Sequence, residues 1–229
     1  MDKALANELV GMAEEQVLAV GAFHAQVASD PGLAGAVRER LGWDASQDPV
    51  EIWRDGPPRS PLTVDLETEW PDAPAVVRTL VGLAAGHEER LRRVLDRHGW
   101  PGRSLAGEDG ADAAWMVAMH ADRDAALQRR CAGLLEEAVE QGEADPRHLA
   151  ALVDRVAGAE HGDQVFGTLA LVRDGRPLFL VPVRDPEGLD DRRRAIGLRP
   201  VQDDLGLEAG QLPYRHLRRS PEYQWPSRR

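Results

Sequence analysis

His120 is the side chain in this sequence best suited to proton transfer, because the imidazole of histidine titrates near neutral pH. Asp122 follows two residues later and could orient the imidazole and fix its tautomer. Residues two apart on a helix face different directions, so Asp122 can help only if the helix has already ended. Asp154, on a neighbouring predicted helix, is the alternative orienting acid. We therefore predict His120, Asp122 and Asp154 as catalytic residues.

Two further charged side chains could complete such a site. Arg155 directly follows Asp154, and a guanidinium suits contact with an anionic substrate group. Glu15, on the first predicted helix, would supply a second carboxylate. Structural roles stay open as alternatives. His120 could be a hydrogen-bonded core residue, Asp122 could help to cap the next helix, and Asp154 with Arg155 could form a buried ion pair.

Metal or cofactor chemistry has weaker support in the sequence. It contains no HExxH motif and no paired ExxH motifs, so we predict no metal, with a site built from His24, His87 and His120 as the alternative. We also predict no organic cofactor. The glycine-rich stretch 107–110 lacks the lysine of a P-loop and a preceding strand, so it indicates close backbone contact with a neighbouring helix. Cys131 lies on an apolar helix face and no GxSxG motif is present, which argues against a nucleophilic Ser or Cys.

The composition limits the partners and the compartment. The formal net charge of −11 would repel phosphate backbones, so we predict no nucleic-acid partner. Cys131 is the only cysteine, which fits a reducing compartment. The sequence has no apolar run long enough to span a bilayer and no signal-peptide pattern, so we predict a cytoplasmic protein without membrane contact. Arginine outnumbers lysine so strongly that we also expect a GC-rich bacterial genome.

The spacing of apolar residues predicts a mainly α protein of about six helices. The expected helices cover about residues 4–28, 31–41, 72–98, 108–121, 124–141 and 145–156, with a last short one over 190–196. Pairs such as Asp30-Pro31 and Asp145-Pro146 indicate helix starts, and Gly42, Gly99 and Gly142 indicate helix ends.

Three segments interrupt this helical pattern. Residues 44–71 hold repeated prolines together with Trp53 and Trp70, and Trp43 directly precedes them. We therefore expect an irregular excursion packed on the rest of the protein. Residues 165–183 read as a β-hairpin, because two apolar runs flank Asp174-Gly175. Residues 211–229 form a basic tail. We therefore predict a single-domain helical bundle over residues 1–210 with a C-terminal hairpin, followed by that tail.

A long series of residues with fixed order and spacing carries a family resemblance. It comprises Trp100-Pro101, Ser104, Gly107, Gly110-Ala111, Ala113-Ala114-Trp115, His120-Ala121-Asp122, Gln128, Cys131, Gly142-Glu143, Leu149-Ala150, Asp154-Arg155-Val156, Gln164, Phe166-Gly167-Thr168, Pro186-Glu187, Asp190, Arg192-Arg193 and Gly197-Leu198. Over about residues 76–205 the chain resembles a bacterial family catalogued as a domain of unknown function, number 6624. The resemblance implies no particular reaction.

The resemblance adds candidate substrate contacts at Trp115, Gln164, Phe166 and Thr168. Members of the family usually begin with a helix that bears an acid–Gln pair, as Glu15-Gln16 does here, and an Arg one turn later, where this chain has Ala19 or Val20. They also tend to have Gln, Tyr and Gln where this chain has Met119, Phe166 and Leu169. The loss of these polar groups implies that the family's activity is altered or absent here, and it would suit a more apolar substrate.

These observations lead to two hypotheses of different class. The first is an enzyme that acts on a small molecule by general acid–base chemistry without an organic cofactor, in bacterial natural-product metabolism. The second is a non-catalytic protein-binding module that uses the hairpin, the 44–71 excursion and the basic tail. A homodimer is compatible with either.

Overall fold

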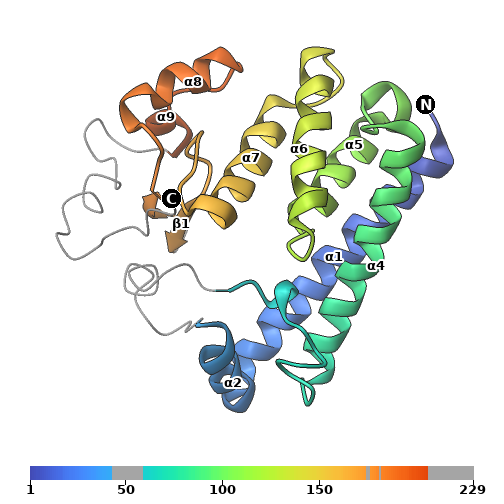
Figure 1. Cartoon of the computed structure of the whole chain (residues 1–229), viewed down its shortest axis with the longest axis vertical. Helices are drawn as coiled ribbons and strands as arrows, with labels where there is room; N and C mark the ends of the chain where they lie inside the picture. Colours follow the sequence, from blue (N-terminus) through green and yellow to red (C-terminus); the bar gives the residue numbers. More distant parts are fainter. Residues whose placement is uncertain (43–58, 174–175, 181, 206–229) are drawn as a thin grey trace. The chain divides into compact units, whose positions relative to one another are not determined.

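Helices make up most of the structure, a computed structural model that describes residues 1–42, 59–173, 176–180 and 182–205 (Figure 1). The contacts of the chain divide it into two units, Met1–Ala144 and Asp145–Arg229. Each unit is described by itself below.

The first unit is built around three long helices. α1 spans Lys3–Ser29, α4 spans Ala75–His98 and α5 spans Arg103–Met119. Each of these three helices contacts the other two. The shorter α2 (Pro31–Leu41) packs on α1, the 3₁₀ turn η1 (Pro61–Thr63) packs on α4, and α6 (Ala125–Glu140) packs on α5.

Local signals set the ends of the first helices. The carboxylate of Asp2 accepts hydrogen bonds from the backbone N–H groups of Ala4 and Leu5, which have no partner inside α1. Asp30 caps α2 in the same way, and Pro31 occupies its first turn. Gly42 ends α2 with a φ of +69°, a conformation that glycine adopts without strain.

The buried faces of α1 and α4 follow the helical period, with polar exceptions near their middles. On α1 the buried residues are Leu5, Leu9, Met12, Gln16, Phe23 and Val27. On α4 they are Val77, Leu80, Val81, Ala84, His87, Glu88, Leu91, Val94 and Leu95. Gln16, His87 and Glu88 are thus polar residues within buried helix faces that are otherwise apolar.

The bend in α5 explains the glycine-rich stretch 107–110. Gly107 has a φ of +75° and breaks the helix, so regular helix resumes after it. A Cβ atom at Gly110 would lie 2.8 Å from the Ala106 Cβ and 3.3 Å from the Ala6 Cα. The predicted close approach of the backbone to a neighbouring helix is therefore confirmed, and that neighbour is α1.

The described part of the excursion packs as expected. Trp70 is buried, and the Arg40 guanidinium lies 5.1 Å from the centre of its ring. Arg59 forms a bidentate ion pair with Glu69, with both contacts at 2.8 Å. Trp43 and Trp53 lie outside the described residues, as does the basic tail, so the 1–210 and 211–229 boundaries stay predictions.

The second unit begins with α7 (Pro146–His161). The short strands β1 (Ala170–Arg173) and β2 (Arg176–Leu180) pair antiparallel, and their register is irregular between Leu171 and Val172. The 3₁₀ turn η2 (Pro186–Gly188), α8 (Leu189–Ala195) and α9 (Val201–Leu205) follow, and η2 and α9 both contact α8.

The predicted fold is correct in being mainly helical, but the predicted β-hairpin over 165–183 is wrong in that form. The strand pairing covers only four and five residues, Ala170–Arg173 and Arg176–Leu180. The apolar run from Val165 resembles a strand, but Asp154 binds the backbone N–H groups of Val165, Phe166 and Thr168, and Gly167 turns the chain at a φ of +71°. Those N–H groups are therefore not available to a β-ladder.

Candidate functional site

A buried polar contact joins the middle of α1 to the middle of α4. The Gln16 and His87 side chains sit on the inward faces of the two helices and are 1% and 3% exposed. The His87 Nδ1 lies 3.2 Å from the Gln16 Oε1, and the His87 Nε2 lies 3.0 Å from the Glu15 Oε2. Both ring nitrogens therefore have a polar partner on α1.

This contact reaches from the helix interface to the surface. The Glu15 side chain is 54% exposed, yet its carboxylate reaches the buried ring of His87. A carboxylate oxygen can only accept, so the hydrogen between the two groups belongs to Nε2 when Glu15 is ionised. The arrangement is a half-exposed carboxylate held from behind by a buried imidazole.

Glu88, the next residue of α4, faces the junction between α5 and α6. It is 8% exposed, and its carboxylate accepts the backbone N–H of Arg123. Its Oε1 has no hydrogen-bond partner. Burial raises the pKa of Glu88, while the Arg123 N–H and the charges of Arg123 and Arg92 act in the opposite direction. Successive residues of α4 thus connect α1 to the α5–α6 junction.

His120 lies at this junction, as the residue that ends α5. Its Nδ1 is 2.9 Å from the carbonyl oxygen of Met116. A carbonyl can only accept, so Nδ1 carries the hydrogen and the lone pair of the neutral ring is on Nε2. This geometry suits a proton acceptor, and the half-buried side chain also fits the structural alternative.

Asp122 follows the end of α5, as the predicted His–Asp pairing requires, but its described contacts are to other groups. The Ser60 hydroxyl donates to one carboxylate oxygen at 2.7 Å, and the Gln128 amide donates to the other at 3.3 Å. Asp124 caps α6 by accepting the Leu127 N–H at 2.8 Å. These bonds tie the segment before η1 to the α5–α6 junction.

Asp154 is fully buried inside the second unit. One carboxylate oxygen accepts the backbone N–H groups of Val165 and Phe166, at 2.6 and 2.7 Å. The other accepts the N–H and the hydroxyl of Thr168, both at 2.8 Å. Burial raises the pKa of Asp154, and these four donors oppose it by favouring the ionised form. Its contacts therefore explain Asp154 as a structural carboxylate, and its predicted catalytic role gains no support from them.

Gln164, another predicted residue of this unit, also binds its backbone. The Gln164 side chain, fully buried, accepts the N–H of Leu169 at 2.7 Å and donates to the Leu169 carbonyl at 2.9 Å. Arg193 is buried and donates to the Phe166 carbonyl at 2.7 Å. Arg193 is part of the family resemblance but was not predicted as a buried residue, because one buried arginine among Arg192–Arg194 has no local signature.

The predicted site residues are divided between the two units. Glu15, Trp115, His120 and Asp122 belong to the first, and Asp154, Arg155, Gln164, Phe166 and Thr168 belong to the second. A hollow shared by His120 and the Asp154–Arg155 pair would join both units and stays a prediction. His87 and Gln16 were not predicted as site residues. The signal that could have identified them is a polar residue within the apolar face of each helix.

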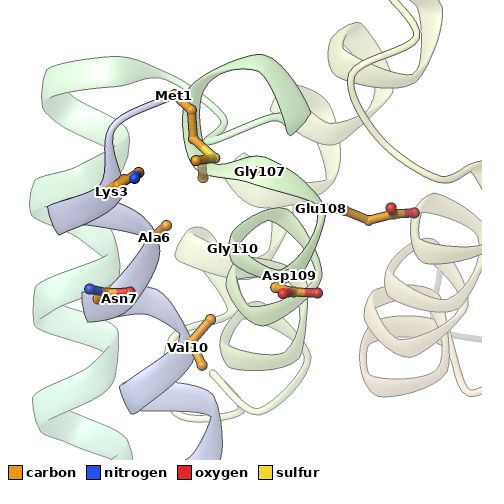
Figure 2. A pocket seen from close by; sticks show the side chains of 10 residues that line it. Met1, Lys3, Ala6, Asn7, Val10, Gly107, Glu108, Asp109 and Gly110 are labelled. Atoms are coloured by element: carbon orange, nitrogen blue, oxygen red, sulfur yellow. The ribbon is translucent and has the colours of Figure 1, made fainter.

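A cleft of about 470 Å³ lies at the other end of the first unit, between the start of α1 and the bend of α5 (Figure 2). Its lining includes Ala6, Val10 and the two glycines of α5, together with the exposed charged residues Lys3, Glu108 and Asp109. Figure 2 shows the Glu108 side chain pointing away from α1. The cleft thus lacks a buried polar group, in contrast to the Glu15–His87 contact.

Two further properties concern the described part of the chain. No group of three His, Cys, Asp or Glu side chains there could hold a metal ion. None of its helices has the length and hydropathy needed to cross a bilayer.

Fold and site together define a mainly helical protein whose first unit holds a buried imidazole against a half-exposed carboxylate. The chain belongs to DUF6624, a family of unknown function, whose model matches residues 62–211. The predicted resemblance is therefore confirmed, and Glu15 and Gln16 precede the matched region. Neither the curated proteins nor the solved structures gave a match.

Proposed function

We propose that this protein is an enzyme that acts on a small molecule by general acid–base chemistry. The observation that carries the proposal is the 3.0 Å contact between the buried His87 Nε2 and the carboxylate of Glu15. Paired imidazole and carboxylate groups are a common arrangement for moving protons in enzymes. In the proposed site, Glu15 contacts the substrate and His87 is a positioning residue.

The exposure of the two groups sets their roles. His87 is too deeply buried to meet a substrate directly, whereas Glu15 reaches solvent. In the proposed step, the Glu15 Oε1 takes a proton from the substrate, and Glu15 becomes a carboxylic acid while the substrate keeps the electron pair. The Nε2–H of His87 keeps its hydrogen bond to the Glu15 Oε2 and so holds the carboxylate in place.

His120 is the proposed second proton-transfer group. Its hydrogen bond to the Met116 carbonyl makes Nε2 the basic nitrogen of the neutral ring. His120 is also three residues before Arg123, whose backbone N–H binds Glu88. Bacterial natural-product metabolism, a cytoplasmic location and a more apolar substrate are finer parts of the same proposal. They rest on the composition and on Met119, Phe166 and Leu169.

The experiment measures proton abstraction directly. The full-length protein is incubated in D₂O with a panel of carbonyl compounds, esters and lactones, and mass spectrometry follows deuterium uptake and product formation. We expect Glu15→Gln to lower the rate on an active compound by at least about 100-fold, the lower range for general acid–base groups. His87→Gln should lower the rate less, because Glu15 remains.

Glu14→Gln is the matched control, because Glu14 is exposed on the same helix turn. It should keep the wild-type rate. A wild-type protein that exchanges or converts no compound of the panel would count against the proposal. So would an active compound that Glu15→Gln processes at the wild-type rate.

The alternative of a protein-binding module falls largely on segments outside the described residues. Those segments are most of the 44–71 excursion, the turn of the hairpin and the basic tail. It stays a prediction.

A further inference from the structure

Gln16 has an unusual hydrogen-bonding position behind His87. Its Oε1 lies 3.2 Å from the His87 Nδ1, and its Nε2 has no partner although the side chain is 99% buried. A buried N–H without an acceptor destabilises a fold, so a glutamine here needs a reason beyond filling the core.

The amide group supplies that reason, because it can be either donor or acceptor. When His87 is an imidazolium, both ring nitrogens carry hydrogens, and the Gln16 oxygen accepts the one on Nδ1. When His87 is neutral, the carboxylate of Glu15 keeps the hydrogen on Nε2, and Nδ1 becomes an acceptor. Rotation of the Gln16 amide by half a turn then presents its NH₂ group to Nδ1.

We propose that Gln16 is a positioning residue that keeps His87 hydrogen-bonded in both protonation states by rotating its amide. The inference rests on the proposed function, since a hydrogen bond to Nδ1 in either protonation state keeps the imidazole in position to hold Glu15 through its Nε2–H. A glutamate at position 16 could only accept when ionised, and a methionine of similar length would leave Nδ1 without a strong partner. Of these three side chains, only glutamine can accept from Nδ1–H in one state and donate to Nδ1 in the other.

Nuclear magnetic resonance of ¹⁵N-labelled full-length protein tests this without any substrate. The ring signals of His87 are assigned by their loss in His87→Gln, and the side-chain NH₂ signals of Gln16 by their loss in Gln16→Met. We expect the Gln16 NH₂ signals to shift as His87 changes protonation state. A ¹⁵N–¹⁵N coupling across the hydrogen bond from Gln16 Nε2 to His87 Nδ1 should appear only when His87 is neutral.

Two variants add opposite expectations at one fixed pH. Gln16→Glu favours Nδ1–H and should raise the fraction of doubly protonated His87. Gln16→Met leaves that N–H unsatisfied and should lower the fraction. The matched controls Gln26→Glu and Gln26→Met change an exposed residue of α1 and should leave His87 unaffected.

The inference is overturned if the Gln16 NH₂ signals do not change with the protonation of His87, which is measured on the wild-type protein once the signals are assigned. It is also overturned if both variants shift the fraction in the same direction, as a purely structural role would allow. These outcomes are independent of turnover, whereas the proposed function is tested by the rates of Glu15→Gln and Glu14→Gln. The failure of one can therefore be told apart from the failure of the other.

Discussion

The buried imidazole of His87 supports a carboxylate that is half in solvent, with 3.0 Å between the His87 Nε2 and the Glu15 Oε2. The two residues are 72 positions apart in the sequence and come from different helices. The two side chains differ in exposure, because Glu15 reaches solvent and His87 does not. Any proton that enters this site from solvent meets Glu15 before His87.

His120→Ala should lower turnover by about 10²-fold if His120 is the second proton-transfer group. Its Nε2 is the basic nitrogen of the neutral ring, and alanine removes it. The rate on any compound active in the D₂O panel provides the measurement. His98→Ala, at an exposed position in the last turn of α4, is the control. Unchanged turnover in His120→Ala would remove His120 from the mechanism.

Glu88→Gln should stabilise the protein at neutral pH and have less effect in acid. Because burial raises the pKa of Glu88 above its ordinary value of 4.5, the folded state holds this proton more tightly than the unfolded state. The stabilisation that protonated Glu88 gives the folded state is fully present below the pKa of Glu88 in the unfolded chain. It is lost as the pH rises through the pKa of Glu88 in the folded protein. Glutamine stays neutral throughout and avoids that loss.

The measurement for Glu88 is urea unfolding of both proteins in acid and at neutral pH. Glu137→Gln, on the exposed face of α6, should leave the free energy of unfolding unchanged at both. A Glu88→Gln variant whose advantage over the wild type shrinks on going from acid to neutral pH would contradict this prediction.

Asp154→Asn should destabilise the second unit by about 3 kcal/mol, because the carboxylate accepts four hydrogen bonds that an amide cannot all replace. Denaturant unfolding of the full chain measures this loss. Asp191→Asn, at an exposed position on α8, should change the free energy of unfolding by less than about 0.5 kcal/mol. Wild-type stability in Asp154→Asn would mean that the four bonds contribute little.

Cys131 should resist thiol reagents in the folded protein. It is fully buried, and this burial raises the pKa of its thiol to about 12, so almost no thiolate is present at neutral pH. Titration with a thiol-specific reagent should label Cys131 only after denaturant is added. Rapid labelling of the native chain would show that α6 opens readily from α5.

Local sequence signals were enough to place most helices. Asp30 with Pro31 and Asp145 with Pro146 mark helix starts in the structure as they do in the sequence, and Gly42 ends α2. Such signals work because caps and glycine turns involve neighbouring residues alone. They failed over residues 165–169, where the backbone N–H groups bind Asp154 instead of another strand.

The sequence by itself determined a mainly helical chain and its family, because helical periodicity is a property of successive residues. Only the tertiary structure decided that the Gln16 and His87 side chains meet, that Glu15 closes the contact from the surface, and that Asp154 is used to hold a turn. Each of those relationships depends on which helices pack together and in what register. Periodicity assigns a residue to a face, and packing alone selects its partner.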